Sequence, residues 1–176
     1  PIISPKKYRL NKYLSILFSF VLLFCSNTKN SINIPADFYF KISNGANDSY
    51  NSKTGEFKRS YLEGTKSYRI TLSDEEKKNI YNLQQTIEFH KFPQNFEIIW
   101  NQSDTITVVM PSFDTSIEIC ENDNCKKVIL DFINLRNPIN DKSKAFDYKK
   151  LYDKIWQIIE SKEEYKNIPE SDFFYL

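Results

Sequence analysis

The sequence predicts an α+β fold, with an antiparallel sheet in two strand–strand–helix units, two helices packed on one face and a disulfide-stapled hairpin. Three observations predict it. Apolar residues alternate with polar ones in several short runs, which is typical of strands that bury one face. Two longer segments carry apolar residues at spacings of three and four, which is typical of helices that pack on a sheet. Cys120 and Cys125 bracket a turn-forming tetrapeptide between two of the alternating runs.

The N-terminal segment is typical of a targeting sequence. Basic residues come first, and a mostly apolar run of 11 residues, Leu14–Phe24, follows them. A bilayer-spanning helix needs about 20 apolar residues, so this shorter run fits the core of a secretory signal instead. We therefore expect a signal peptide over residues 1–24, a polar tether over residues 25–34 and a single α+β domain over residues 35–176.

The segment Leu22–Cys25 (LLFC) resembles a bacterial lipobox, in which the cysteine is acylated and becomes the first residue of the mature chain. Leu22 carries the resemblance, whereas Phe24 departs from the small residue usual before the cysteine. The resemblance implies lipidation at Cys25 and firm membrane anchoring through more than one acyl chain. The residue after the cysteine is Ser26, which is not a signal for retention in the inner membrane, and this favours the outer membrane. A secreted protein cleaved near Cys25 and an uncleaved anchor are the alternatives.

The first unit is predicted to begin with a strand over Pro35–Ser43, in which Phe38, Phe40 and Ile42 share one face. The polar, turn-rich stretch Asn44–Gly55 predicts a long flexible loop. Two further strands follow, separated by a turn at Glu63-Gly64. Their alternating residues are Phe57, Arg59 and Tyr61 in one strand and Tyr68, Ile70 and Leu72 in the other.

The first predicted helix begins after Ser73. Ser73 and Glu76 have the spacing of a capping box, which satisfies free N–H groups at a helix start. Apolar residues then recur with helical spacing at Ile80, Leu83 and Ile87. Phe89, Phe92 and Pro93 close the unit.

The second unit is predicted to repeat this plan loosely. Its expected elements are short strands at Glu97–Trp100 and Asp104–Met110, hairpin strands at Thr115–Cys120 and Lys126–Phe132, a loop at Asn134–Ser143 and a helix at Ala145–Ser161. The helix is expected to bury Phe146, Leu151, Ile155 and Ile158, with Tyr148, Tyr152 and Ile159 widening the stripe. The apolar end of the chain, residues 169–176, is expected to dock on the domain.

The hairpin pattern predicts a disulfide between Cys120 and Cys125 across a four-residue loop, Glu121–Asn124. In that register Glu118 faces Lys127 and Ile117 faces Val128. The signal segment favours an oxidising compartment, and two free thiols are the alternative. A calcium loop at Glu121, Asp123 and Asn124 is disfavoured, because the required glycine and distal glutamate are missing.

Charge and composition argue against several classes of function. The formal charge is +1, but removal of residues 1–24 leaves 20 basic against 23 acidic residues, or −3, so nucleic acid is not an expected partner. The chain has one histidine, His90, and three glycines, and no nucleophile motif is present. We therefore expect no enzyme activity, no cofactor and no metal. Trp100 and Trp156 are expected in the core rather than in a ligand site.

The segment Asp37–Pro93 resembles small uncharacterised lipoproteins of the bacterial cell envelope. The shared pattern is a strand, an Asn/Asp/Gly-rich loop with S-x-T-G, a second hairpin and a helix that begins L-S-x-E-E-K. The resemblance covers about a third of the chain. It implies an envelope location and provides no catalytic residue.

These observations favour a non-enzymatic envelope lipoprotein that binds a protein or another ligand. An inhibitor or immunity protein is one specific form of this hypothesis. An exposed edge strand, the Asn44–Gly55 loop and the disulfide hairpin are the candidate contact surfaces. Two alternatives stay open: an envelope hydrolase that uses carboxylates, and a structural component of the envelope.

Overall fold

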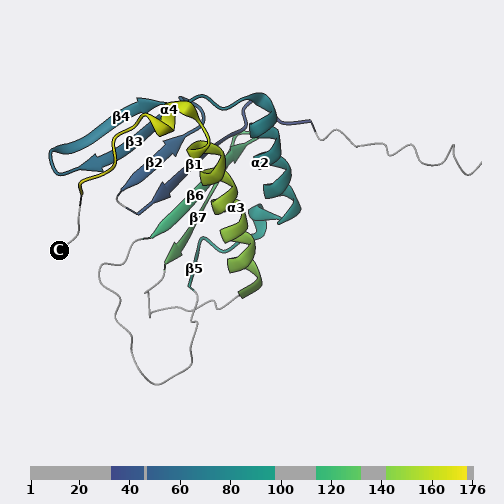
Figure 1. Cartoon of the computed structure of the whole chain (residues 1–176). Coiled ribbons are helices and arrows are strands. Elements are labelled where there is room, and N and C mark those ends of the chain that lie inside the picture. The colour runs from purple at the N-terminus through teal and green to yellow at the C-terminus, as the bar shows by residue number, and fades with distance from the viewer. Residues whose placement is uncertain (1–32, 46, 98–113, 132–141, 174–176) are drawn as a thin grey trace, which may run out of the picture. The chain divides into compact units, whose positions relative to one another are not determined.

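The computed structural model describes residues 33–45, 47–97, 114–131 and 142–173 (Figure 1). The chain divides into a unit at Pro1–Asn33 and a compact unit at Ile34–Leu176. The predicted signal peptide, Cys25 and most of the predicted tether lie outside the described residues, as do the predicted strand Asp104–Met110 and most of the loop Asn134–Ser143. None of the described helices has the length and apolar composition of a membrane-spanning segment.

A seven-stranded sheet of order β4-β3-β2-β1-β6-β7-β5 forms the centre of the compact unit. Its strands are β1 (Tyr39–Asn44), β2 (Asp48–Asn51), β3 (Glu56–Tyr61), β4 (Gly64–Arg69), β5 (Asn95–Glu97), β6 (Thr115–Glu121) and β7 (Asn124–Asp131). Six strands pair in antiparallel fashion, and β5 adds a parallel edge beside β7. The predicted α+β class is therefore confirmed.

The helices lie against one face of this sheet (Figure 1). They are α2 (Asp74–Thr86), the 3-10 turn η1 (Phe89–Lys91), α3 (Lys142–Glu160) and the short α4 (Glu163–Lys166). The predicted capping box at the start of α2 is confirmed: Glu76 N–H donates to Ser73 Oγ at 3.3 Å, and Ser73 N–H donates to Glu76 Oε2 at 2.7 Å. Both bonds satisfy donors that the first helical turn leaves free.

The core lies between the sheet and the two long helices. Alternate residues of the strands meet the apolar stripes of α2 and α3, which removes both surfaces from water. The fully buried members include Phe40, Phe57, Ile70, Ile80, Ile117, Val128, Leu151, Ile155 and Ile159. Trp156 is also in the core, as predicted, where it meets Phe57 edge to face at 6.4 Å between ring centroids.

The predicted flexible loop Asn44–Gly55 is wrong. It contains β2, which pairs with β1 on one side and β3 on the other. Tyr50 faces the core and donates its hydroxyl to the Ile70 carbonyl at 3.1 Å, which ties this short polar strand to the interior. Gly45 and Gly55 make the turns at either end with φ of 57° and 72°, which suits glycine because it has no Cβ.

Other element boundaries also differ from the prediction. The third predicted strand ends at Arg69, so Ile70 and Leu72 are buried after the strand rather than within it. Of the strand predicted at Glu97–Trp100, only Glu97 is described; it ends β5, which begins at Asn95, and the other three residues lie outside the described part of the chain. The helix α3 begins at Lys142 instead of Ala145.

The predicted burial of Phe146 is wrong, because its side chain is 59% exposed. The buried stripe of α3 runs through Ala145, Tyr148, Leu151 and Ile155, and Phe146 lies off this face. Tyr148 occupies the core position instead, with its hydroxyl at 3.2 Å from that of Thr115.

The C-terminal tail docks on the end of β3, as predicted for residues up to Asp172. Hydrogen bonds hold it there. The Pro169 carbonyl accepts from Arg59 Nη1 at 3.1 Å and from the Tyr61 hydroxyl at 2.9 Å, and Ser171 Oγ donates to the Ser60 carbonyl at 2.6 Å. The last three residues lie outside the described part of the chain.

Candidate functional site at the disulfide hairpin and the polar face

The sheet has a second face, turned away from α2 and α3, which we call the polar face. Side chains alternate along each strand, so residues between the core positions point to this side. Its members include Tyr39, Lys41, Ser43, Ser49, Asn51, Glu56, Lys58, Ser116, Glu118, Cys120, Cys125, Lys127 and the apolar Ile129. They come from β1, β2, β3, β6 and β7, and no described helix covers them.

The β6–β7 hairpin supplies one end of the polar face. Cys120 pairs with Cys125, Glu118 with Lys127 and Ile117 with Val128, so the predicted register is confirmed. The predicted four-residue loop is wrong, because Glu121 and Asn124 pair and only two residues form the turn. Asn122 and Asp123 have φ of 51° and 61°, a conformation that their short polar side chains tolerate and that suits a tight hairpin.

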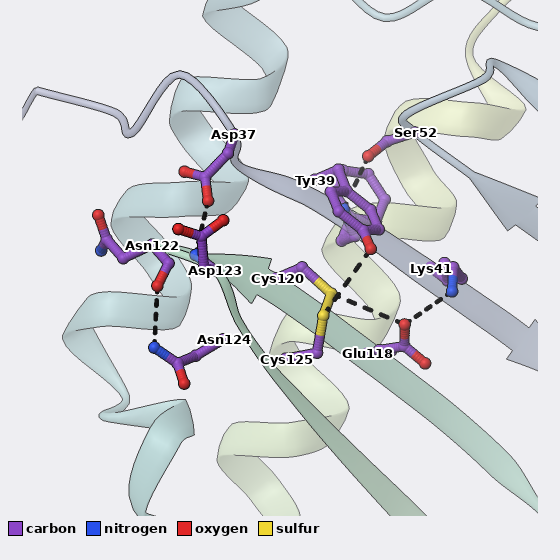
Figure 2. Close-up of a disulfide and its surroundings, with 11 residues drawn as sticks. Asp37, Tyr39, Lys41, Ser52, Glu118, Cys120, Asn122, Asp123, Asn124 and Cys125 are labelled. Carbon is purple, nitrogen blue, oxygen red and sulfur yellow. Dashed lines mark hydrogen bonds and ion pairs between the residues drawn. A yellow bond between two sulfur atoms is a disulfide. The ribbon is translucent and has the colours of Figure 1, made fainter.

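The predicted disulfide between Cys120 and Cys125 is present (Figure 2). The two Cα atoms are 4.1 Å apart. Residues directly opposite each other in an antiparallel pair approach this closely where they do not exchange backbone hydrogen bonds. Cys120 is buried, whereas Cys125 is exposed, so the bridge reaches from the sheet to the surface.

Polar groups of β1 and β6 surround the disulfide (Figure 2). The Tyr39 hydroxyl lies 3.8 Å from Cys125 Sγ and must be the donor, since a disulfide sulfur carries no proton. Glu118 Oε1 lies 3.7 Å from Cys120 Sγ, which is a contact and not a hydrogen bond for the same reason. Lys41 Nζ donates to the same carboxylate oxygen at 2.7 Å.

Lysines surround the Tyr39 ring and the Glu118 carboxylate. Lys41 and Lys127 come from the strands on either side of Glu118. The hydrogen bond from Lys41 to Glu118 raises the pKa of Lys41, against a smaller opposing effect of burial. Lys53 Nζ lies 4.9 Å from the Tyr39 ring centroid, within cation–π distance. This end of the polar face therefore combines an aromatic ring with several cations and one paired carboxylate.

The segment before β1 is tied to the hairpin turn. Asp123 N–H donates to Asp37 Oδ2 at 2.8 Å, and Asn124 Nδ2 donates to the Asn122 carbonyl at 2.9 Å (Figure 2). Hydrogen bonds from the backbone of Asp123 and Asn122 lower the pKa of Asp37, because they favour the ionised carboxylate. The turn is therefore held in place by the chain that leads into the domain.

Two shallow concavities lie on or beside the polar face. One, of about 300 Å³, is lined by hydroxyl, amide and lysine side chains that include Ser43, Ser49, Asn51, Lys58 and Ser116. The Ser43 and Ser116 hydroxyls are hydrogen-bonded across β1 and β6 at 2.7 Å. The other, of about 470 Å³, lies beside the disulfide and is lined by Asp37, Tyr39, Lys53, Lys77 and Cys125 among others. Both offer hydrogen bonds and charged groups of both signs to a polar partner.

Among the described residues, only one group brings three metal-ligating side chains close together, and its chemistry does not support a metal site. Glu118, Cys120 and Cys125 place their donor atoms within 4.8 Å of one another. Both sulfurs are bonded to each other, however, and a metal requires thiolates. The Glu121 carboxylate of the disfavoured calcium loop accepts from Gln84 at 3.4 Å and from Gln85 at 3.2 Å.

The other candidates from the sequence are placed as follows. His90 is exposed on η1. Cys25 and Trp100 lie outside the described residues, so lipidation at Cys25 stays a prediction. The expected edge strand is β4, which ends the described sheet on one side and is largely exposed.

Sequence reasoning missed the gathering of Tyr39, Lys41 and Ser43 around the hairpin. Their alternation with Phe38, Phe40 and Ile42 signals an outward face, but only the β1–β6 pairing shows which strand lies beside them. Comparisons with protein-family models, with curated proteins and with solved structures find no match to this chain.

Proposed function

We propose that this chain is a lipoprotein of the bacterial envelope whose domain is a non-enzymatic binding module, with the polar face as its contact surface. The observation that carries the proposal is the disulfide at the exposed hairpin. Thiols in a reducing cytosol stay unpaired, so a structural disulfide favours an oxidising compartment. This agrees with a signal peptide before Cys25.

The chemistry of the polar face supports binding. The strands of the sheet present an aromatic ring at Tyr39, hydroxyls at Ser43 and Ser116, and a positive charge at Lys127. Such groups provide hydrogen bonds and contact area to a protein surface. The β4 edge is a weaker candidate, because Lys66 and Arg69 disfavour the addition of another strand. An inhibitor or immunity protein would be one form of such a module.

Metabolic labelling tests the anchor. The full chain is expressed in a bacterial host with labelled palmitate, beside a Cys25→Ala variant. The proposal expects label on the parent chain and none on the variant. Label on both chains, or on neither, would remove the lipoprotein assignment. Thiol alkylation before and after reduction, with Cys120 and Cys125 identified by mass, tests the oxidising compartment in the same cells.

Site-specific photo-crosslinking tests the contact surface. A photoreactive residue is placed at Lys127 on the polar face and, as a matched control, at the exposed Lys150 of α3. The proposal expects a discrete adduct from position 127 in intact cells and none from position 150. Equal adducts at both positions would contradict it. A turnover assay that responds to substitution of carboxylates would instead favour the hydrolase alternative.

A further inference from the structure

The two sulfurs of the disulfide differ in their access to solvent. Cys120 is only 3% exposed, whereas Cys125 is an exposed residue of β7. Cys120 lies on β6, between its register partner Tyr39 of β1 on one side and Cys125 on the other. On its far side, β7 pairs with β5 only at residues 129–131. Among the described residues, no strand therefore lies beside Cys125 on the side away from Cys120.

The Tyr39 side chain shields the Cys120 sulfur from the β1 side. Tyr39 stands on β1, yet its hydroxyl lies 3.8 Å from Cys125 Sγ, so its side chain reaches across Cys120 to the second sulfur. Figure 2 shows this ring on the β1 side of the bridge. The Glu118 carboxylate adds to the shield, with Oε1 at 3.7 Å from Cys120 Sγ. These neighbours agree with the low exposure of Cys120.

Thiol–disulfide exchange requires a defined direction of approach. The attacking thiolate bonds to one sulfur in line with the S–S bond, while the other sulfur leaves. Attack at Cys120 Sγ therefore has to come from the side where Tyr39 lies. Attack at Cys125 Sγ comes from the opposite side, which the described residues leave open. The concavity of about 470 Å³ beside the bridge does not open the first route, since it has Tyr39 in its wall and Cys120 is buried.

The structure provides a partner for each sulfur when the bond opens. Once released, Cys120 carries a thiol, and Glu118 Oε1 lies close enough to accept a hydrogen bond from it. Lys41 Nζ holds that carboxylate oxygen in place at 2.7 Å. The Tyr39 hydroxyl can donate to the negative charge that forms on Cys125 Sγ during the attack.

Opening the bridge does not require the hairpin to unfold. The strand β6 pairs with β7 over Thr115–Glu121 and with β1 over Thr115–Cys120. The hairpin also buries Ile117 and Val128 in the core. The strands are therefore held by hydrogen bonds and packing on both sides of the bridge, so the reduced domain keeps the same sheet.

We propose that the Cys120–Cys125 bridge is a thiol-exchange site in the folded domain, attacked at Cys125 Sγ by the thiolate of a small thiol or a protein dithiol. The thiolate sulfur bonds to Cys125 Sγ, the bond between the two cysteines breaks, and Cys120 leaves with the electron pair and takes up a proton. A second thiol then attacks the sulfur that arrived first. Two thiols are thereby oxidised to one disulfide, and the bridge is reduced to two thiols. Neither lipidation nor a binding partner is required, so this site goes beyond the proposed function.

Peptide mapping of the first mixed disulfide tests the site of attack. The full chain carries Cys25→Ala, which leaves Cys120 and Cys125 as its only cysteines, and is kept in a neutral detergent. Reduced glutathione is added, the free thiol is trapped at early times with N-ethylmaleimide, and cleavage before Asp123 separates the two cysteines. The proposal expects glutathione on Cys125 and maleimide on Cys120 in at least about nine of ten adducts.

Two variants of Tyr39 test the shielding. Tyr39→Ala removes the ring from the β1 side and is expected to raise the share of adducts on Cys120 by at least about threefold. Tyr39→Phe keeps the ring and should keep the selectivity for Cys125, with attack slowed by about twofold because the hydroxyl is lost. Far-UV circular dichroism checks that both chains fold. If Tyr39→Ala does not fold, mapping of the parent and the urea series below decide the question.

A urea series separates exchange in the folded domain from exchange after unfolding. A bridge that opens only in the unfolded chain is reduced faster by about fivefold or more for each molar step of urea. The proposal expects reduction by dithiothreitol to change by less than about twofold at urea concentrations below the unfolding transition. The reduced chain should also retain the circular dichroism of the oxidised chain.

Three results would overturn the inference. They are equal adducts on Cys120 and Cys125 in the parent, reduction with the urea dependence of unfolding, and no reduction below the transition by any thiol up to about 50 mM. Reduced thioredoxin, a protein dithiol, is tested beside glutathione to distinguish the two sources. Exchange at micromolar thioredoxin assigns the site to protein dithiols, and exchange with glutathione alone assigns it to small thiols. Palmitate labelling at Cys25 can succeed or fail separately.

Discussion

Two ion pairs in the same sheet have nearly equal distances and very different surroundings. Lys41 and Glu118 pair across β1 and β6 at 2.7 Å, with side chains 46% and 23% exposed. Arg59 and Asp48 pair across β3 and β2 at 2.8 Å, with side chains 9% and 13% exposed. The first pair lies on the polar face beside the disulfide, and the second holds the C-terminal tail. The comparison teaches that burial and further partners, rather than distance, decide what an ion pair does for stability.

The hydrogen-bond acceptors around Arg59 explain why its ion pair with Asp48 can be buried. Arg59 donates to Asp48, Tyr165 and the Pro169 carbonyl and lies near the Phe57 ring at 5.3 Å. A buried guanidinium needs such a set of acceptors, because an unpaired one would lose its hydration without compensation. The hydrogen bond with Asp48 raises the pKa of Arg59 above its usual range, so the cation persists at all pH values in which the fold exists. The pair therefore links β2, β3 and the tail.

The largest effect is expected from Asp48→Ala. The substitution leaves Arg59 buried without its main partner, which should lower the free energy of unfolding by about 3 kcal/mol. Urea denaturation of the full chain measures it. A paired Asp48→Leu, Arg59→Met chain removes both charges and should recover much of the loss. A loss below about 1 kcal/mol for Asp48→Ala would contradict the importance given to burial.

The disulfide should have the next largest effect. Cys120 and Cys125 are separated by 5 positions, so the loop that they close is short and its closure is expected to contribute about 2 kcal/mol. Cys120→Ser with Cys125→Ser should lose that amount in urea denaturation. Reductant should destabilise the parent similarly and leave the variant unchanged. If the variant and the parent unfold at the same urea concentration, the hairpin is held by its strands alone.

An intermediate case is the pair of Glu76 and Lys162, joined at 2.6 Å with side chains 25% and 19% exposed. Burial alone would raise the pKa of Glu76, but the bonds from Lys162 and Ser73 outweigh it and lower the pKa. A lowered folded-state pKa means that the stabilisation is present above the unfolded pKa and is lost as pH falls through the folded value. Glu76→Gln should cost about 1 kcal/mol at neutral pH and flatten the loss of stability below about pH 4.5. A parent and variant with parallel acid profiles would refute this assignment.

The smallest effect is expected from Lys41→Ala. An exposed ion pair contributes about 0.5 kcal/mol or less, and salt weakens it further. A double-mutant cycle with Glu118→Gln isolates the coupling energy from other effects of each change. A coupling above about 1 kcal/mol would remove the contrast with Arg59 and Asp48.

The sequence predicted correctly those elements whose own residues show a recognisable pattern, such as alternation in a strand or a capping pair at a helix start. The register of the β6–β7 hairpin followed from alternation on both sides of the cysteines, and the start of α2 followed from Ser73 and Glu76. The turn length was wrong, because Asn122 and Asp123 can both adopt positive φ and close the hairpin with fewer residues. The strand β2 was missed, because it is four residues long and polar except for Tyr50. It is a strand because β1 and β3 supply hydrogen-bonding partners on both sides.

The sequence by itself determined the fold class, the cysteine pairing and the capped helix, since each depends on residues close together along the chain. Only the tertiary structure decided which residues share a surface. Tyr39 meets Cys125 across 86 positions, and Arg59 meets the Pro169 carbonyl across 110. No periodicity encodes the pairing of β1 with β6 or the passage of α3 over the strand ends. The polar face therefore exists only once sheet order and packing bring distant segments together, because burial of the apolar core selects that arrangement.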